Sequence, residues 1–111
     1  MRTPLLAAAI AALALTAVAT PAVAIDTIDC QRDQNPAERT ICSSQRLQVL
    51  DAKVTEAYAD IMLDGGIKAR VKDAVYISQL EFLHRRDACG RDPRCLAEVM
   101  EHRASRINFY R

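Results

Sequence analysis

Three features of the sequence predict a small all-α protein, an antiparallel bundle of about four helices stapled by two disulfides. Apolar residues recur at steps of three and four along most of the second half of the chain, as in amphipathic helices. No stretch alternates apolar and polar residues over the length of a strand. Four cysteines follow an N-terminal export signal, and paired cysteines in an oxidising compartment are expected to form disulfides.

Residues 1–24 have the pattern of a removable export signal. Arg2 supplies the positive start, residues 5–18 form the apolar run, and Ala22-Val23-Ala24 supplies the small residues of a peptidase site. A retained membrane anchor is the alternative, but the run is short for crossing roughly 30 Å of hydrocarbon as a helix. We therefore expect cleavage between Ala24 and Ile25, and a secreted or periplasmic product without a membrane anchor.

The remaining residues, 25–111, are enough for one domain. They carry 14 basic and 14 acidic side chains, and this balance argues against nucleic acid, whose phosphates require a basic excess. Residues 25–64 have a formal charge of −4 and residues 65–111 of +4. We expect the two halves to neutralise each other by folding together; an acidic face that attracts a cationic partner is the alternative.

The first two helices have clear boundaries. Asn35-Pro36-Ala37-Glu38 combines a cap, a proline at the first position and a capping-box glutamate, so a short helix should run to about Cys42. Ser44 should cap a second helix, ended by Asp64-Gly65-Gly66, where glycine can take the left-handed conformation. Its predicted apolar face is Leu47, Leu50, Val54, Ala57, Tyr58 and Ile61, and its predicted wetter flanks hold Asp51, Lys53, Glu56 and Asp60.

Two more helices complete the predicted bundle. The third should run from about Ile67 to Ala88 and end at Gly90, and Asp92 should cap a fourth that has Pro93 at its first position. The apolar positions expected on the third are Val71, Val75, Leu80, Phe82 and Leu83. Those expected on the fourth are Leu96, Val99, Met100, Ala104 and Ile107.

The four cysteines allow three disulfide pairings. Cys89 and Cys95 lie on either side of a tight turn, which can bring their α-carbons within the roughly 4.4–6.8 Å that a disulfide needs. We therefore favour pairing these two, with Cys30 joined to Cys42. A zinc site would usually contain a closer cysteine pair, and a redox site a Cys-x-x-Cys, so we expect no metal and no cofactor.

Several motifs, in this order, carry a family resemblance. They are Cys30 with residues 35–42 (NPAERTIC), Leu47-x-x-Leu50-Asp51 with Tyr58, Gln79 to Phe82, residues 86–90 (RDACG), and Cys95-Leu96 with Arg103. Together they span about residues 30 to 107. With these motifs the chain resembles the N-terminal domain of LprI-type lysozyme inhibitors, small secreted bacterial proteins that often have Trp in place of Phe82. The resemblance implies a helical, disulfide-bonded fold and, as the family's named activity, lysozyme inhibition; it assigns no inhibitory residue.

Residues that could suggest an enzyme are more simply explained as structural. A catalytic triad needs a nucleophile activated by a base, itself held by a third group. The histidines are His84 and His102, and none of the four serines lies in a nucleophile-elbow or Ser-x-x-Lys motif. Asp60 and Asp64 lie one turn apart, which is commonplace for surface acids. We expect no catalytic activity.

Four arginines flank the predicted turn between Cys89 and Cys95, at Arg85, Arg86, Arg91 and Arg94. Arg86 is expected to pair with Asp51 or Glu56 on the facing helix. The functional alternative is that the four contact carboxylates of a partner, such as the two acids in the cleft of a lysozyme.

The sequence therefore predicts a secreted or periplasmic protein that binds and blocks a c-type lysozyme. The alternative is a non-catalytic binding or structural module of the cell envelope without lysozyme activity.

Overall fold

The structure is a computed structural model that describes residues 27–32 and 34–110, and all regular structure in these ranges is helical. The elements are α1 (Pro36–Cys42), α2 (Gln45–Leu63), α3 (Ala69–Ala88), α4 (Pro93–Arg106) and a final 3₁₀ turn, η1 (Ile107–Tyr110). The predicted all-α fold is confirmed. The predicted export signal and its cleavage site, Ala24–Ile25, lie outside the described residues.

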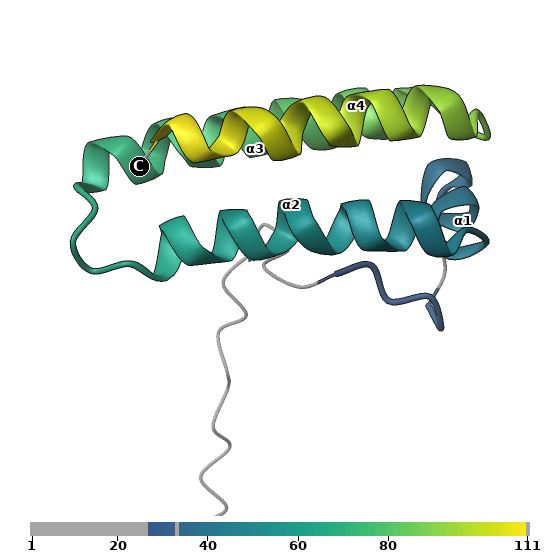
Figure 1. Cartoon of the computed structure of the whole chain (residues 1–111), viewed down its shortest axis with the longest axis horizontal. Helices are drawn as coiled ribbons and strands as arrows, with labels where there is room; N and C mark the ends of the chain where they lie inside the picture. Colours follow the sequence, from purple (N-terminus) through teal and green to yellow (C-terminus); the bar gives the residue numbers. More distant parts are fainter. Residues whose placement is uncertain (1–26, 33, 111) are drawn as a thin grey trace, which may run out of the picture.

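The three long helices lie side by side along the molecule, with α2 in one layer and α3 and α4 in the other (Figure 1). Each reverses the direction of the one before it, so α3 runs antiparallel to both α2 and α4. The short α1 packs across the end where α2 begins, in contact with all three long helices. The same end holds the turn between α3 and α4, which is closed by a disulfide.

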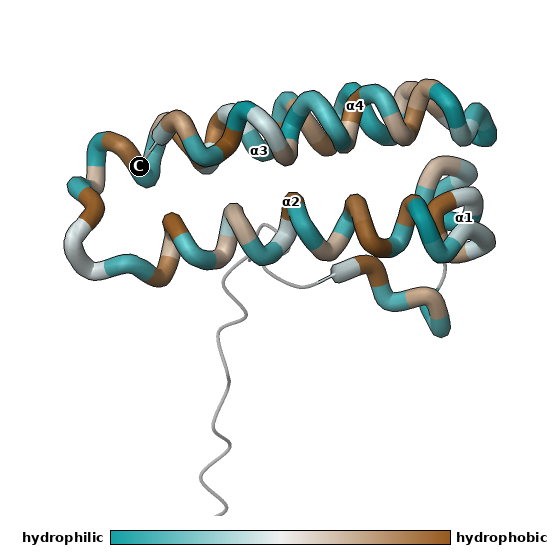
Figure 2. Tube along the Cα trace, viewed as in Figure 1, coloured by the Kyte–Doolittle hydropathy of each residue, from teal (hydrophilic) through white to brown (hydrophobic). Residues whose placement is uncertain are grey.

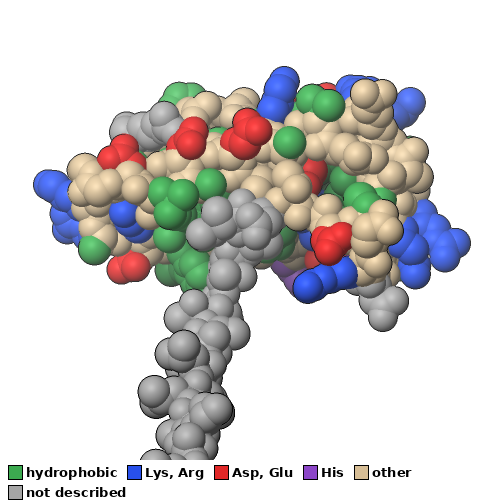
Figure 3. All heavy atoms as spheres, turned by 90° about the horizontal axis from the view of Figure 1, so that it is seen from below, with side chains coloured by type: hydrophobic (Ala, Val, Ile, Leu, Met, Phe, Trp, Pro, Cys, Tyr) green, Lys and Arg blue, Asp and Glu red, His purple; other side chains and the backbone are tan. Residues whose placement is uncertain are grey.

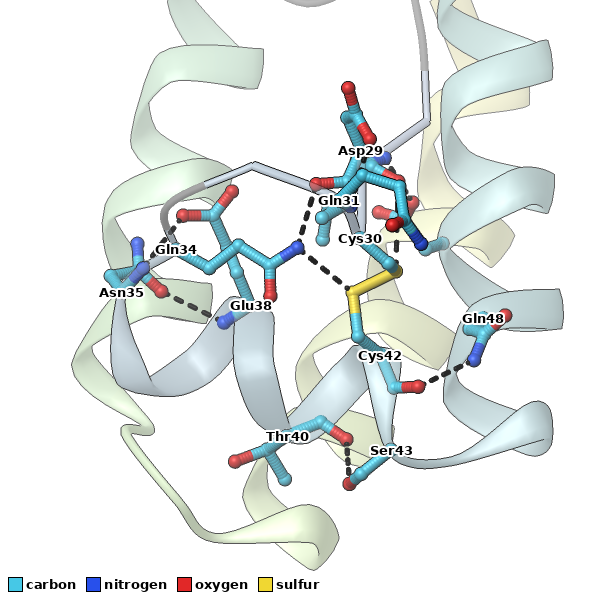
Figure 4. The surroundings of a disulfide bond; sticks show 12 residues. Asp29, Cys30, Gln31, Gln34, Asn35, Glu38, Thr40, Cys42, Ser43 and Gln48 are labelled. Atoms are coloured by element: carbon cyan, nitrogen blue, oxygen red, sulfur yellow. Dashed lines mark hydrogen bonds between the residues drawn. A yellow bond between two sulfur atoms is a disulfide. The ribbon is translucent and has the colours of Figure 1, made fainter.

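The starts of α1, α2 and α4 carry the caps that the sequence predicts, whereas α3 begins after Lys68 without a side-chain cap. The Asn35 side chain accepts from the Glu38 N–H at 2.8 Å, and the Glu38 side chain accepts from the Asn35 N–H at 3.1 Å, which completes a capping box (Figure 4). Ser44 accepts from Leu47 N–H, and Asp92 accepts from the N–H groups of Arg94 and Cys95. Each cap supplies an acceptor to amides that have no partner inside the helix.

The glycines differ from prediction in how they end helices. Gly65 and Gly66 do not have positive φ; α2 ends at Leu63 and is followed by Asp64, whose carboxylate accepts from the Gly66 N–H at 2.8 Å. An aspartate can close such a turn with its own side chain, so the left-handed conformation is not needed there. Gly90 does have a positive φ, of 57°, directly after α3. Termination of a helix by a glycine in the left-handed conformation therefore occurs after α3, at Gly90, and not after α2.

The core consists of two apolar clusters, one toward each end of the bundle. The larger lies near α1 and comprises Ala37, Ile41, Leu47, Leu50, Val54, Phe82, Leu96, Ala97 and Met100. The smaller lies toward the other end and comprises Tyr58, Ile61, Val75 and Ile107. Figure 2 shows apolar residues interleaved with polar ones along every helix, as expected when each helix buries one face.

Polar side chains are buried between and beside the clusters, which the apolar pattern did not predict. Asp51, placed on a wetter flank by the sequence, is buried, because it accepts from the Ile28 N–H and faces Arg86. Gln79 and Arg103 are buried against each other. Conversely, Leu80, expected in the core, is 44% exposed, because the buried face of α3 passes through Gln79 instead.

Both favoured disulfides, Cys30–Cys42 and Cys89–Cys95, are present, with α-carbons 5.7 Å and 5.6 Å apart. The first ties the segment before α1 to the end of α1 (Figure 4). Gln34 strengthens this tie by donating to the Asp29 carbonyl at 2.7 Å. Gln48 joins it to α2 by donating to the Cys42 carbonyl at 2.8 Å. Covalent and polar links thus hold the first helix to the bundle.

Candidate functional site

The first candidate surface is the α3–α4 corner, residues 89–95, with the arginines that flank it. Arg91 and Arg94 are exposed, and no hydrogen bond or ion pair holds either guanidinium within the described residues. Arg85 is exposed and lies 3.6 Å from Glu81, one turn earlier on α3. Figure 3 shows Lys and Arg side chains at both ends of the molecule, including the end on the right of the view, which holds α1 and this corner.

Arg86 differs from the other three arginines. Its side chain is 8% exposed and lies 3.9 Å from the Asp51 carboxylate, as the sequence predicted for a structural role. It also contacts the Asp87 carboxylate at 2.9 Å. The pKa of Asp51 is raised, because burial of its carboxyl outweighs the Ile28 N–H bond and the Arg86 charge, which lower it. A guanidinium held in this way is not free to contact a partner, so the corner presents Arg85, Arg91 and Arg94.

The second candidate surface is a groove of about 350 Å³ between α3 and α4. We call it the α3/α4 groove. Its lining residues are Ser78, Glu81, Phe82, Arg85, Glu98, Val99, His102, Arg103, Arg106 and Tyr110.

Arg103 is the buried charge of this groove. It is 7% exposed, and its Nε and Nη2 both donate to Oε1 of Gln79, at 3.1 Å and 2.9 Å. Its guanidinium also lies 5.8 Å from the centre of the Phe82 ring, a cation–π distance. No carboxylate forms an ion pair with it within the described residues. Burial lowers the pKa of Arg103, as desolvation does for any cation.

Helical spacing could have revealed the buried polar residues. Val75, Gln79, Phe82 and Arg86 follow one another at steps of four, three and four along α3. Leu96, Met100, Arg103 and Ile107 repeat the same steps through α4 and into η1. When the buried positions of a helix are chosen by spacing alone, they include the polar residues. When they are chosen because the residue is apolar, Leu80 is taken in place of Gln79.

The serines and histidines occupy positions of local structure. The hydroxyls of Ser43, Ser78 and Ser105 each donate to a carbonyl three residues earlier, and that of Ser44 caps α2. His84 and His102 are exposed. Ser105 bonds to the backbone carbonyl of His102, but none of these hydroxyls is hydrogen-bonded to an imidazole within the described part of the chain, so no nucleophile–base pair is formed there.

The cysteine sulfurs also have structural roles. All four are in disulfides, so none is present as a thiolate that could ligate zinc. Across residues 27–32 and 34–110, no three His, Cys, Asp or Glu side chains gather into a potential metal site. In the same ranges no helix is both long enough and apolar enough to span a membrane.

Fold and surfaces together define a class: a small, disulfide-stapled helical protein with an arginine-bearing corner and a charged groove between its last two helices. No protein-family model, no curated protein and no solved structure matches this chain. The resemblance to LprI-type inhibitors therefore stays a prediction drawn from the motifs of the sequence.

Proposed function

We propose that this protein is an exported, non-catalytic binding protein that blocks the cleft of a c-type lysozyme with its α3–α4 corner. The observation that carries the proposal is the pair of exposed, uncompensated guanidiniums, Arg91 and Arg94, on a turn closed by Cys89–Cys95. The choice of lysozyme as partner rests on the family resemblance.

The chemistry of the corner suits a carboxylate-bearing partner. A retaining glycosidase such as lysozyme carries two carboxylic acids close together in its cleft. Guanidinium forms bidentate, charge-assisted hydrogen bonds with carboxylates. The disulfide restricts the turn before binding, so little conformational entropy is lost when the complex forms.

The direct test is to titrate the purified, oxidised protein into a lysozyme turbidity assay. We expect lysis to slow until the two proteins are equimolar, and Arg91→Ala combined with Arg94→Ala to weaken inhibition by about tenfold or more, as for central interface residues. Arg70→Ala, an exposed arginine at the far end of α3, is the matched control and should inhibit normally. Arg86 stays intact, because its removal would leave the buried Asp51 without a nearby positive charge.

An unchanged rate of lysis at excess protein would overturn the proposal. So would equal loss of inhibition in the corner variant and in Arg70→Ala. If the protein still inhibits lysozyme after its two disulfides are reduced, the disulfide-closed corner is not the inhibitory device.

A second candidate function is favoured by a row of exposed apolar side chains on α3. Tyr76, Ile77 and Leu80 are 38%, 57% and 44% exposed and are spaced to share one side of the helix. Adjacent exposed apolar residues often mark protein-binding surfaces. They support a binding module of the cell envelope without lysozyme activity. Substitution of Ile77 and Leu80 by serine would abolish such binding and leave lysozyme inhibition unchanged.

A further inference from the structure

The α3/α4 groove contains a buried guanidinium, that of Arg103, which forms no ion pair among the described residues. The hydrogen-bond partner of Arg103 is the amide oxygen of Gln79, which is polar but uncharged. Transfer of a guanidinium from water into a protein is costly unless an opposite charge compensates it. The comparable buried arginine, Arg86, has two carboxylates beside it. Arg103 is therefore the exception among the buried charges of the described chain.

One nitrogen of the Arg103 guanidinium, Nη1, is not used within the described chain. Nε and Nη2 are occupied by Gln79, and Nη1 has no hydrogen-bond partner among the described residues. No fully buried polar side-chain atom of the described chain lacks a partner, so Nη1 must be accessible to solvent. Arg103 also lines the groove. An anion in the groove can therefore reach two N–H bonds that the protein does not use.

Charge and shape limit what the anion can be. Three arginines line the groove, at Arg85, Arg103 and Arg106, and two glutamates, Glu81 and Glu98, offset two of the charges. Among these arginines and glutamates the excess is one positive charge, which suits a monoanion and disfavours a polyanion such as a phosphate ester. Phe82, Val99 and Tyr110 supply apolar lining. A volume of about 350 Å³ is at the small end of the range for ligand sites.

We propose that the α3/α4 groove binds a small organic monocarboxylate with an apolar body. The carboxylate pairs with Arg103 Nη1 and with Arg106 at the rim, and the apolar body lies against Phe82 and Val99. Arg85 borders both the corner and the groove, but the proposal does not depend on lysozyme binding, because its carboxylate contacts are Arg103 and Arg106 rather than Arg91 and Arg94.

The test uses 3-phenylpropanoate as the probe and its uncharged amide, 3-phenylpropanamide, as the matched ligand. ¹H–¹⁵N NMR spectra of the oxidised, isotopically labelled protein follow backbone amides and the arginine Nε–H groups. We expect saturable shifts at Phe82, Val99 and Arg103 with a Kd of about 1 mM or tighter, the range of a small fragment. The amide should bind at least about tenfold more weakly, since an ion pair is worth more than a neutral hydrogen bond.

Variants locate the site. Arg106→Gln removes a rim cation that has no ion pair within the described chain and should weaken carboxylate binding several-fold with the fold intact. Arg70→Gln, an exposed arginine on α3 outside the groove, is the control and should bind normally. Equal affinity for acid and amide would overturn the proposal, as would shifts that stay linear with concentration. Equal weakening by Arg70→Gln and Arg106→Gln would also overturn it, because attraction would then be nonspecific.

Discussion

Arg86 and Arg103 are both buried in one small bundle, but their charges are compensated differently. Arg86 lies beside the carboxylates of Asp51 and Asp87, whereas Arg103 is held by the neutral Gln79 and the face of Phe82. The first arrangement resembles a structural ion pair, and the second leaves charge available to a ligand. Residue type alone does not distinguish them, since both arginines lie on the same helical spacing.

The pH dependence of stability should report the burial of Asp51. Its pKa is raised by folding, so its contribution to stability is complete below the unfolded value of 3.8 and is lost as the pH rises through the folded pKa. We therefore expect the stability of the wild type relative to Asp51→Asn to fall from acid toward neutral pH. Denaturant unfolding at several pH values measures this difference, with the exposed Asp73→Asn as control. A difference that grows with pH would mean that the Arg86 charge outweighs desolvation.

Removal of the Gln79 acceptor should be costly. Gln79→Leu leaves two donors of a buried guanidinium unpaired, and we expect a loss of about 2–3 kcal/mol in the free energy of unfolding. Gln79→Glu keeps an acceptor and should lose less. The neighbouring exposed Leu80→Ala is the control and should change stability by less than about 0.5 kcal/mol. If Gln79→Leu left the free energy of unfolding unchanged in chemical denaturation, water would have to replace Gln79 as the acceptor for Arg103.

At the scale of the helices, their starts were predictable and their ends less so. Asn35, Ser44 and Asp92 act as the caps that their sequence positions predict, because a cap is a local interaction over three residues. The end of α2 was predicted through glycine but is made by the Asp64 side chain. η1, which extends the chain beyond Arg106, was not predicted as a separate element.

The two turn glycines give a matched pair of substitutions. Gly90→Ala places a side chain at φ 57°, and we expect a loss of about 1–2 kcal/mol from steric strain. Gly65→Ala meets no atom within 4 Å and has no positive φ, so it should raise stability by about 0.4–1 kcal/mol by restricting the unfolded chain. Thermal unfolding of both variants measures the contrast. Equal effects would contradict the assignment of the left-handed turn to Gly90.

At the scale of the whole molecule, a small core is supplemented by two covalent links and by polar contacts between halves. The larger cluster joins all four α-helices, whereas the smaller one joins α2, α3 and η1. Among the described residues, the ion pairs that join the first half of the domain to the second include Asp51 with Arg86 and Arg46 with Glu101. The Arg46–Glu101 pair joins a base of the net acidic half to an acid of the net basic half. These pairs therefore account for only part of the expected neutralisation between the halves.

The disulfides should make a large contribution to a domain of this size. We expect Cys30→Ser with Cys42→Ser, or Cys89→Ser with Cys95→Ser, to cost about 2–4 kcal/mol each. The first loss should be larger by about 0.5 kcal/mol, because its sequence separation is 12 residues against 6 and a longer loop restricts the unfolded chain more. Urea denaturation with and without reductant measures both losses. An unchanged midpoint after reduction would contradict this estimate of their importance.

The sequence by itself determined the all-helical class, the caps of α1, α2 and α4 and most of the apolar positions, because helical periodicity and capping act over a few residues. It also favoured the correct disulfide pairing, since Cys89 and Cys95 face each other across one short turn. Only the tertiary structure decided that Asp51 is buried, that Gln79 rather than Leu80 enters the core, and that Arg103 lines a groove. Burial of a polar side chain depends on its partner, and each of these partners lies on another segment, more than twenty residues away in the sequence.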